Sequence, residues 1–132
     1  MLVCHHIILS GKTGGAFKQN LADPEACIRR IWPPGVGTWN APDGRLNRIF
    51  GRPMETGSSP RETAMNVVRK WSGIWGLTPK NLVLAGPFPG DDRTEQTLMW
   101  DRETETYGFT AVYFKQNVQG VPVYNSRLQV LV

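Results

Sequence analysis

Residues 59–76 read SPRETAMNVVRKWSGIWG and carry several agreeing signals for a helix. Ser59 is a good helix N-cap, Pro60 suits the first helical position, and Glu62 completes the Ser-x-x-Glu pattern of a capping box. Apolar residues then recur at three- and four-residue spacing, which places them on one side of a helix: Ala64, Val67, Val68, Trp71, Ile74 and Trp75. The sequence therefore predicts one amphipathic helix over about residues 60–75.

The apolar side of this helix predicts the core of the domain. Its structural residues are Ala64, Val67, Val68, Trp71 and Trp75. The two tryptophans are four residues apart, a spacing that would also suit a surface for stacking on a ligand. Their aliphatic neighbours favour burial instead, and burying side chains of this size stabilises a fold by roughly 1.5–3 kcal/mol each.

Extended segments surround the helix on both sides. Strands are predicted at residues 45–50, 97–100, 107–116 and 121–132, and residues 81–85 predict a short strand or an extended link. The last two strands are joined by Asn117-Val118-Gln119-Gly120, and glycine in so short a link indicates a hairpin. We therefore expect an α+β domain with one amphipathic helix packed on an antiparallel sheet of about four strands.

The last predicted strand changes phase along its length. Apolar residues take odd positions around Val123 but even positions from Leu128 onward. A strand cannot keep both sets on one side without slipping by one residue. Either both sides of the strand are partly covered, or a bulge near Asn125-Ser126 shifts the phase. The chain stops inside this apolar strand, and for that reason we expect it to be a fragment of a longer protein.

The beginning of the chain carries few structural signals. Residues 1–36 contain runs rich in glycine and proline and no clear periodicity, so we expect an irregular or loosely attached segment before a domain that spans 37–132. The first nine residues lack the charged and apolar regions of a signal peptide. The sequence has no run of about 18 apolar residues, so we expect no contact with a membrane.

The residues that could form a catalytic or metal site lack the sequence spacing that such sites require. Cys4, His5, His6 and Cys27 lack the paired arrangement of zinc ligands. The chain has no H-E-x-x-H motif, and the two histidines are adjacent near its start, which argues against a histidine-based triad. The acidic residues between 91 and 105 lack the glycine and terminal glutamate of a calcium loop, and solvated turns explain them better. We therefore expect no catalytic residue, metal or cofactor, and a protein that is not an enzyme.

The charge of the chain does not indicate a nucleic-acid partner. Its net charge is +4, but basic and acidic residues are interspersed, and the densest basic stretch holds three arginines between residues 45 and 52. A nucleic-acid interface needs a basic stripe together with a recognition element, and neither is visible. We expect a protein partner instead.

The final third of the chain contains a specific pattern. Gln116 ends one strand, and Gly120, Val121, Pro122, Val123 and Tyr124 open the next. This order and spacing resembles the signature of the propeptide domains of secreted fungalysin-like and thermolysin-like zinc metalloproteases. There an aromatic-x-Gln strand end precedes a short link and Gly-(Ile/Val/Leu)-Pro-Val-(Tyr/Phe). The resemblance extends over about residues 39–132 and includes the helix.

The resemblance implies a function and a location. It implies a secreted propeptide that acts as an intramolecular chaperone and inhibitor, with the metalloprotease catalytic domain as its partner in cis. The main alternative, from another class, is a non-catalytic adhesion or scaffold module of a larger extracellular protein. A small enzyme is a third alternative, which the missing site residues disfavour.

The motif residues also have a physical interpretation of their own. Gly120 allows the turn, and Pro122 fixes φ and lacks a donor, which suits a strand's beginning or an edge. Gln116 is expected to satisfy main-chain groups of the turn through both ends of its side-chain amide. For Gly120 and Pro122 the simpler interpretation is that they only make a stable hairpin.

Overall fold

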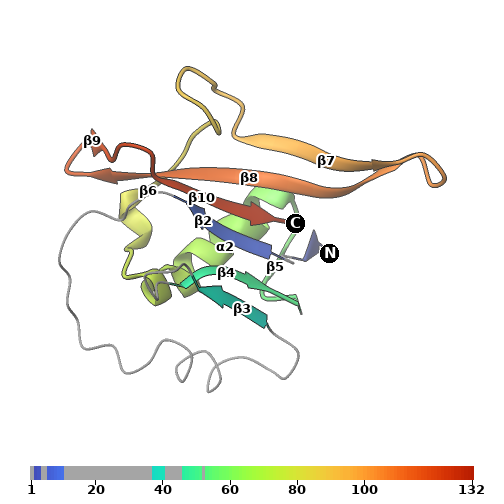
Figure 1. Cartoon of the computed structure of the whole chain (residues 1–132), viewed down its shortest axis with the longest axis horizontal. Helices are drawn as coiled ribbons and strands as arrows, with labels where there is room; N and C mark the ends of the chain where they lie inside the picture. The colour runs from blue at the N-terminus through green and yellow to red at the C-terminus, as the bar shows by residue number, and fades with distance from the viewer. Residues whose placement is uncertain (1, 4–5, 11–36, 41–45, 52) are drawn as a thin grey trace.

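The computed structural model describes residues 2–3, 6–10, 37–40, 46–51 and 53–132 (Figure 1). The strands are β1 (Leu2–Val3), β2 (His6–Ser10), β3 (Gly37–Asn40), β4 (Leu46–Phe50), β5 (Thr56–Gly57), β6 (Leu82–Leu84), β7 (Glu95–Asp101), β8 (Thr106–Val118), β9 (Val121–Pro122) and β10 (Arg127–Leu131). The helices are α2 (Pro60–Trp71) and two 3-10 turns, η1 (Ser72–Trp75) and η2 (Pro79–Asn81).

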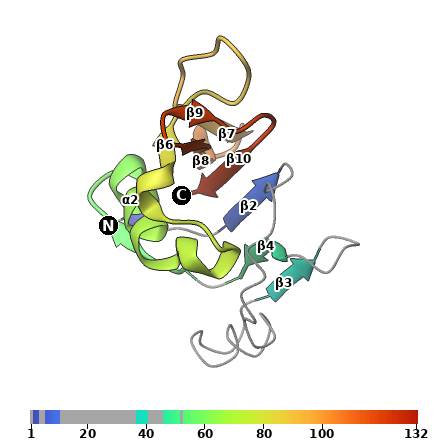
Figure 2. The same ribbon diagram turned by 90° about the vertical axis from the view of Figure 1, so that its left-hand side faces the viewer.

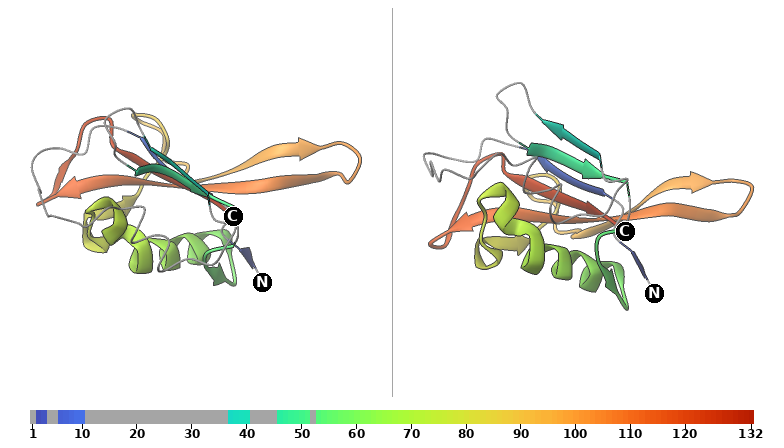
Figure 3. Two further views of the ribbon diagram at one scale, coloured as in Figure 1. Left: turned by 60° about the horizontal axis from the view of Figure 1, so that its bottom comes forward. Right: turned by 90° about the horizontal axis from the view of Figure 1, so that it is seen from below.

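The main sheet is antiparallel throughout its described strands. Its order is β3-β4-β2-β10-β8-β6, and β7 and β9 also pair with β8. Strands β1 and β5 form a separate small pair. Helix α2 lies along one side of the sheet, as the views in Figures 2 and 3 show. The α+β class predicted from the sequence, with one amphipathic helix on an antiparallel sheet, is thereby confirmed.

The N-terminal segment departs from the expectation that residues 1–36 are irregular. Strand β2 lies between β4 and β10 in the main sheet, with Ile7 opposite Ile49 on one side and Val130 on the other. The physical reason is that β10 has a free edge on that side, and a short β-branched stretch from a distant part of the chain can satisfy its main-chain groups. Residues 11–36, including Cys27, lie outside the described residues.

The start of α2 follows the predicted cap with one difference. The Ser59 hydroxyl accepts a hydrogen bond from the Glu62 N–H at 3.1 Å, and the Ser59 carbonyl accepts one from the Thr63 N–H at 2.9 Å. The Glu62 carboxylate, however, accepts from the N–H of Ser58 at 2.8 Å and from the Ser58 hydroxyl, not from Ser59. These hydrogen bonds lower the pKa of Glu62. The reciprocal bond of the capping box thus shifts by one residue.

The predicted helix changes character before its end. It is an α-helix to Trp71 and continues as the 3-10 turn η1 to Trp75. Gly76 then adopts a left-handed conformation with φ 69°, and the N–H of Leu77 donates to the Ser72 carbonyl at 3.1 Å. A glycine in this conformation ends the helix because it carries no Cβ that would clash.

The core lies between α2 and one side of the main sheet. From the helix, Ala64, Val67, Val68 and Trp71 are buried, while Trp75 is half-buried and packs at the margin. From the strands, the buried side chains are those of Ile49, Leu82, Val112, Phe114, Leu128 and Val130. The even positions of β8 and β10 therefore point toward the helix.

The change of phase predicted in the last strand arises because that segment is two strands and not one. The segment expected as one strand over 121–132 forms β9 and β10, with a turn between them at which Asn125 has φ 54°. Leu128 and Val130 face the core on the far side of this turn, whereas Val121 before it is exposed. The break stands at the predicted Asn125-Ser126 position, but it is a turn rather than a bulge.

Candidate docking surface

The predicted motif residues gather in residues 116–126, the end of β8 and the segment after it, which we call the motif turn. Gln119 and Gly120 have positive φ angles of 51° and 83°. Two consecutive residues of this kind are what a two-residue type I′ hairpin turn requires. Val118 and Val121 face each other across the turn as the first pair of β8 and β9. Gly120 therefore has the structural role that the sequence predicts for it.

A second set of hydrogen bonds folds the rest of the motif turn back onto β8. The Val123 N–H donates to the Gln116 carbonyl at 2.8 Å, and the Gln116 N–H donates to the Ser126 hydroxyl oxygen at 3.0 Å. The Ser126 hydroxyl in turn donates to the Val123 carbonyl at 2.9 Å. Because Ser126 is buried, water does not compete for these bonds. The motif turn therefore has a fixed main-chain conformation.

The role of Gln116 differs from the expectation. Its main chain, not its side-chain amide, holds the turn. The side-chain Oε1 atom is buried and has no hydrogen-bond partner within the described part of the chain. The reason is its position: Gln116 shares the parity of Val112 and Phe114 on β8, so its side chain points to the helix side and away from the turn.

The side chains of the motif turn point mostly into solvent. Tyr124 is 93% exposed and Val121 is 66% exposed, and Pro122 between them is also exposed. Val118 on the other arm of the hairpin is 40% exposed, whereas Val123 is half-buried. A fixed main chain that presents a tyrosine and two valines to solvent is a pre-organised apolar surface of the kind that docks on proteins.

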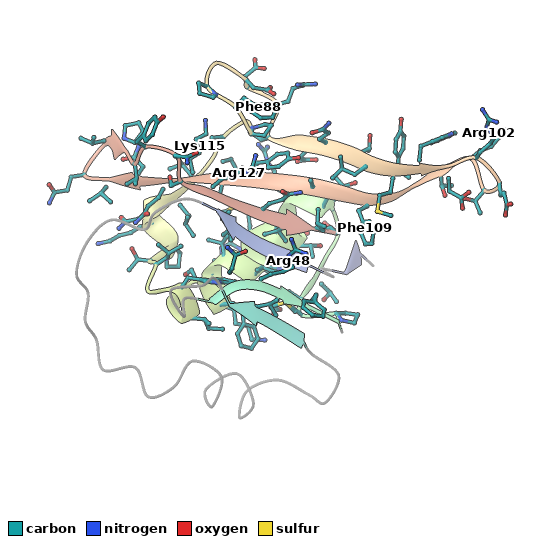
Figure 4. The ribbon with its side chains drawn as sticks, in the orientation of Figure 1. Arg48, Phe88, Arg102, Phe109, Lys115 and Arg127 are labelled. Carbon is teal, nitrogen blue, oxygen red and sulfur yellow. The ribbon has the colours of Figure 1, made fainter. Side chains whose placement is uncertain are left out.

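Charged residues lie next to the motif turn. Lys115 donates from Nζ to the Phe88 carbonyl at 3.4 Å, and the Phe88 ring on that loop is 62% exposed. Arg127 follows the turn and occupies the position opposite Lys115, since Leu128 pairs with Phe114. Figure 4 shows Phe88, Lys115 and Arg127 near this end of the sheet. The surface beside the motif turn thus combines an exposed ring with two basic side chains, Lys115 and Arg127, and the Asp91 carboxylate lies near Lys115.

An ion pair fixes the loop that carries Phe88. Arg93 binds both carboxylate oxygens of Asp91, with Nε at 3.0 Å and Nη2 at 2.8 Å, and its N–H also donates to the same carboxylate at 3.0 Å. This arrangement lowers the pKa of Asp91 to about 2 and raises that of Arg93.

The Tyr113 hydroxyl donates to Gln96 Oε1 at 3.1 Å, and burial raises the pKa of that tyrosine.

The remaining acidic residues singled out in the sequence have separate local contacts. Glu95 lies 3.7 Å from Arg61 of α2. Asp101 accepts hydrogen bonds from the Glu103 N–H and the Thr104 hydroxyl, both at 2.9 Å, which lowers the pKa of Asp101. Asp92, Glu103 and Glu105 are exposed. These acids thus serve turns and surface pairs.

No group of three or more potential metal ligands occurs within residues that the structure describes. Cys4, His5 and Cys27 lie outside those residues, and only the main chain of His6 is described. Over the same described residues, no helix has the length and apolar character needed to cross a membrane.

One exposed surface of the molecule was not predicted from the sequence. The paired strands β7 and β8 extend past the rest of the sheet and past α2 (Figures 1 and 3). Leu98, Trp100, Tyr107 and Phe109 all belong to this two-stranded ribbon. Apolar residues at 98 and 100, mirrored by 107 and 109 across a polar turn, are the signal that would have revealed it.

Comparison with known proteins finds no matching family model, no matching curated protein and no matching solved structure.

Proposed function

We propose that this chain is the propeptide module of a secreted thermolysin-like or fungalysin-like metalloprotease. In this proposal it is non-catalytic, and it binds the catalytic domain in cis, assists its folding and keeps it inactive until cleavage. The observation that carries the proposal is the motif turn, in which a hydrogen-bonded main chain presents Val121 and Tyr124 to solvent. Three of the residues that carry the family resemblance, Val121, Pro122 and Tyr124, are thus available to a partner.

The proposal separates structural from binding roles within the motif. Gly120 and Gln116 set the main chain, the first by its positive φ and the second by its N–H and carbonyl. Val121 and Tyr124 contribute little to the core because they are largely exposed. An exposed tyrosine on a fixed segment is a typical hot-spot residue, because docking costs it little conformational entropy.

Inhibition of a mature protease tests the proposal. The 132-residue chain is titrated against a mature thermolysin-like protease, ideally one encoded by the same source, and the residual peptidase activity is measured. We expect dose-dependent inhibition by the wild type. Tyr124→Ala should weaken inhibition by about 30-fold or more, because truncating a hot-spot residue costs about 2 kcal/mol or more.

A second tyrosine provides the matched control. Tyr107 is 52% exposed and lies at the other end of β8, so Tyr107→Ala should not weaken the inhibition. Equal losses for the two variants would place the contact elsewhere than the motif turn. No inhibition of a cognate protease, and no gain in its refolding yield, would favour the adhesion or scaffold alternative.

A further inference from the structure

The ribbon of β7 and β8 has one apolar and one polar side. Leu98 pairs with Phe109 and Trp100 pairs with Tyr107, so these four side chains share one side of the ribbon. The other side carries small and polar residues together with one exposed methionine: Thr97, Met99, Asp101, Thr106, Gly108 and Thr110. We call the four-residue set Leu98, Trp100, Tyr107 and Phe109 the ribbon patch.

The ribbon patch lies on the opposite side of the sheet from α2. Glu95 of β7 is within 3.7 Å of Arg61 in the helix, and Glu95 has the opposite parity to Leu98 and Trp100. Trp100 and Tyr107 are 54% and 52% exposed, with their rings edge to face and their centroids 4.9 Å apart. A two-stranded ribbon gains stability when its apolar side is covered by another layer.

The two ends of this side of the sheet differ in charge. The distal turn beyond the ribbon patch carries the carboxylates of Asp101, Glu103 and Glu105 and the guanidinium of Arg102, a net charge of −2 (three negative, one positive). At the other end, Lys115 has the parity of Tyr107 and Phe109, and Arg127 lies beside it. Figure 4 shows Arg102 at the tip of the ribbon, Phe109 nearer its base, and Lys115 and Arg127 over the body of the sheet.

We infer that the ribbon patch docks on the ribbon patch of a second copy of this chain, about a two-fold axis close to Phe109. The distal residues 103–105 lie four to six positions from Phe109 in one direction, and Lys115 lies six positions from it in the other. At about 3.3 Å per residue of extended strand, residues 103–105 lie at most roughly 13–20 Å from the axis and Lys115 lies roughly 20 Å from it. The two-fold operation therefore brings the acidic turn of each copy over Lys115 and Arg127 of the other.

In this dimer the apolar side chains are covered, and the charged residues at each end face opposite charges. The Leu98–Phe109 pairs of the two copies meet at the axis, and the Trp100–Tyr107 pair of each copy lies over the other ribbon near Ala111. Each copy makes the same two charge contacts at the ends. Such an isologous contact closes on itself and yields a dimer rather than a filament. The acidic turn also opposes association with anionic lipids, which attract basic segments. The inference does not depend on the proposed propeptide role.

Association is measured on the full 132-residue chain. Sedimentation velocity or light scattering is recorded from about 1 to about 200 µM, the range in which a small interface is expected to assemble. We expect the mass to rise from 14.8 kDa toward twice that value. Trp100→Ser should raise the dimer dissociation constant by at least about tenfold. A monomeric wild type over the whole range would overturn the inference.

Met99 supplies a matched control on the same ribbon. It is 70% exposed, and it lies across from Gly108 on the polar side, where a Cβ added to Gly108 would be 3.5 Å from the Met99 Cβ atom. Met99→Ser should therefore leave the dissociation constant unchanged. Equal weakening by Met99→Ser and Trp100→Ser would contradict the assignment of the contact to the ribbon patch.

A charge exchange tests the antiparallel arrangement separately. Glu103→Lys and Lys115→Glu should each weaken the dimer several-fold at low salt, and the double variant should recover most of the loss, because the two side chains then face each other with exchanged charges. Far-ultraviolet circular dichroism establishes that each variant is folded. Additive losses in the double variant would exclude the proposed two-fold arrangement.

Discussion

Trp71→Ala is the perturbation whose effect follows most directly from the structure. The Trp71 side chain is 7% exposed and packs in the core between α2 and the sheet. Its indole N–H donates to Glu55 Oε1 at 2.9 Å, and the same carboxylate lies 2.6 Å from Lys70 Nζ. Lys70 Nζ is also 5.0 Å from the centre of the Trp71 ring. Removing the indole therefore leaves a cavity in the core and removes one hydrogen-bond donor to Glu55.

The expected magnitude comes from the cavity. Replacing a buried tryptophan by alanine costs about 3–5 kcal/mol, and we take about 4 kcal/mol here. A 132-residue chain has an unfolding entropy of about 0.28 kcal/mol/K near its melting temperature, from about 2.1 cal/mol/K per residue. The midpoint of thermal unfolding should therefore fall by about 14 °C.

Thermal unfolding followed by circular dichroism at the helix band measures this shift. Tyr124→Ala is the control, because that side chain is 93% exposed and its loss should change stability by less than about 0.5 kcal/mol, or about 2 °C. A Trp71→Ala midpoint within about 2 °C of wild type would refute the assignment of this residue to the core.

Three further changes test local features. Ser59→Ala should lower the free energy of unfolding by about 1 kcal/mol because it removes the cap of α2, and Ser59→Asp should retain it; urea denaturation measures both. Gly120→Ala should destabilise by about 1 kcal/mol or more because φ is 83°, whereas Gly73→Ala, which meets open space, should not. The Asp91 carboxyl should titrate near pH 2 by NMR and move toward 3.8 in Arg93→Ala. Since this pKa is lowered by folding, the stabilisation from the pair is present above about pH 4 and is lost as the pH falls toward 2.

The features that the sequence predicted well depend on neighbouring residues. The α2 helix is specified by its own cap, its apolar spacing and its terminal glycine, all within residues 59–76. The hairpin after β8 is likewise encoded by Gly120 and the strands beside it. Elements of this kind can be predicted from neighbouring residues without the tertiary structure.

The features that the sequence did not predict depend on distant partners. Strand β2 has a short apolar sequence that becomes a strand because β4 and β10 offer edges on both sides. The orientation of Gln116 depends on the parity that the core imposes on β8. The apolar residues at 98, 100, 107 and 109 are visible in the sequence, but they form one exposed surface because Trp100 pairs with Tyr107 and Leu98 with Phe109. Tertiary context decides each of these cases.

Photocrosslinking at residue 124 tests whether the motif turn docks on the protease. A photoreactive phenylalanine analogue replaces Tyr124 in one sample and Tyr107 in another, and each is irradiated with the mature protease. The proposed function predicts that position 124 crosslinks to the protease. The inferred dimer predicts that position 107, in the ribbon patch, crosslinks chain to chain. A protease crosslink from position 107 and none from position 124 would contradict the assignment of the motif turn as the docking surface.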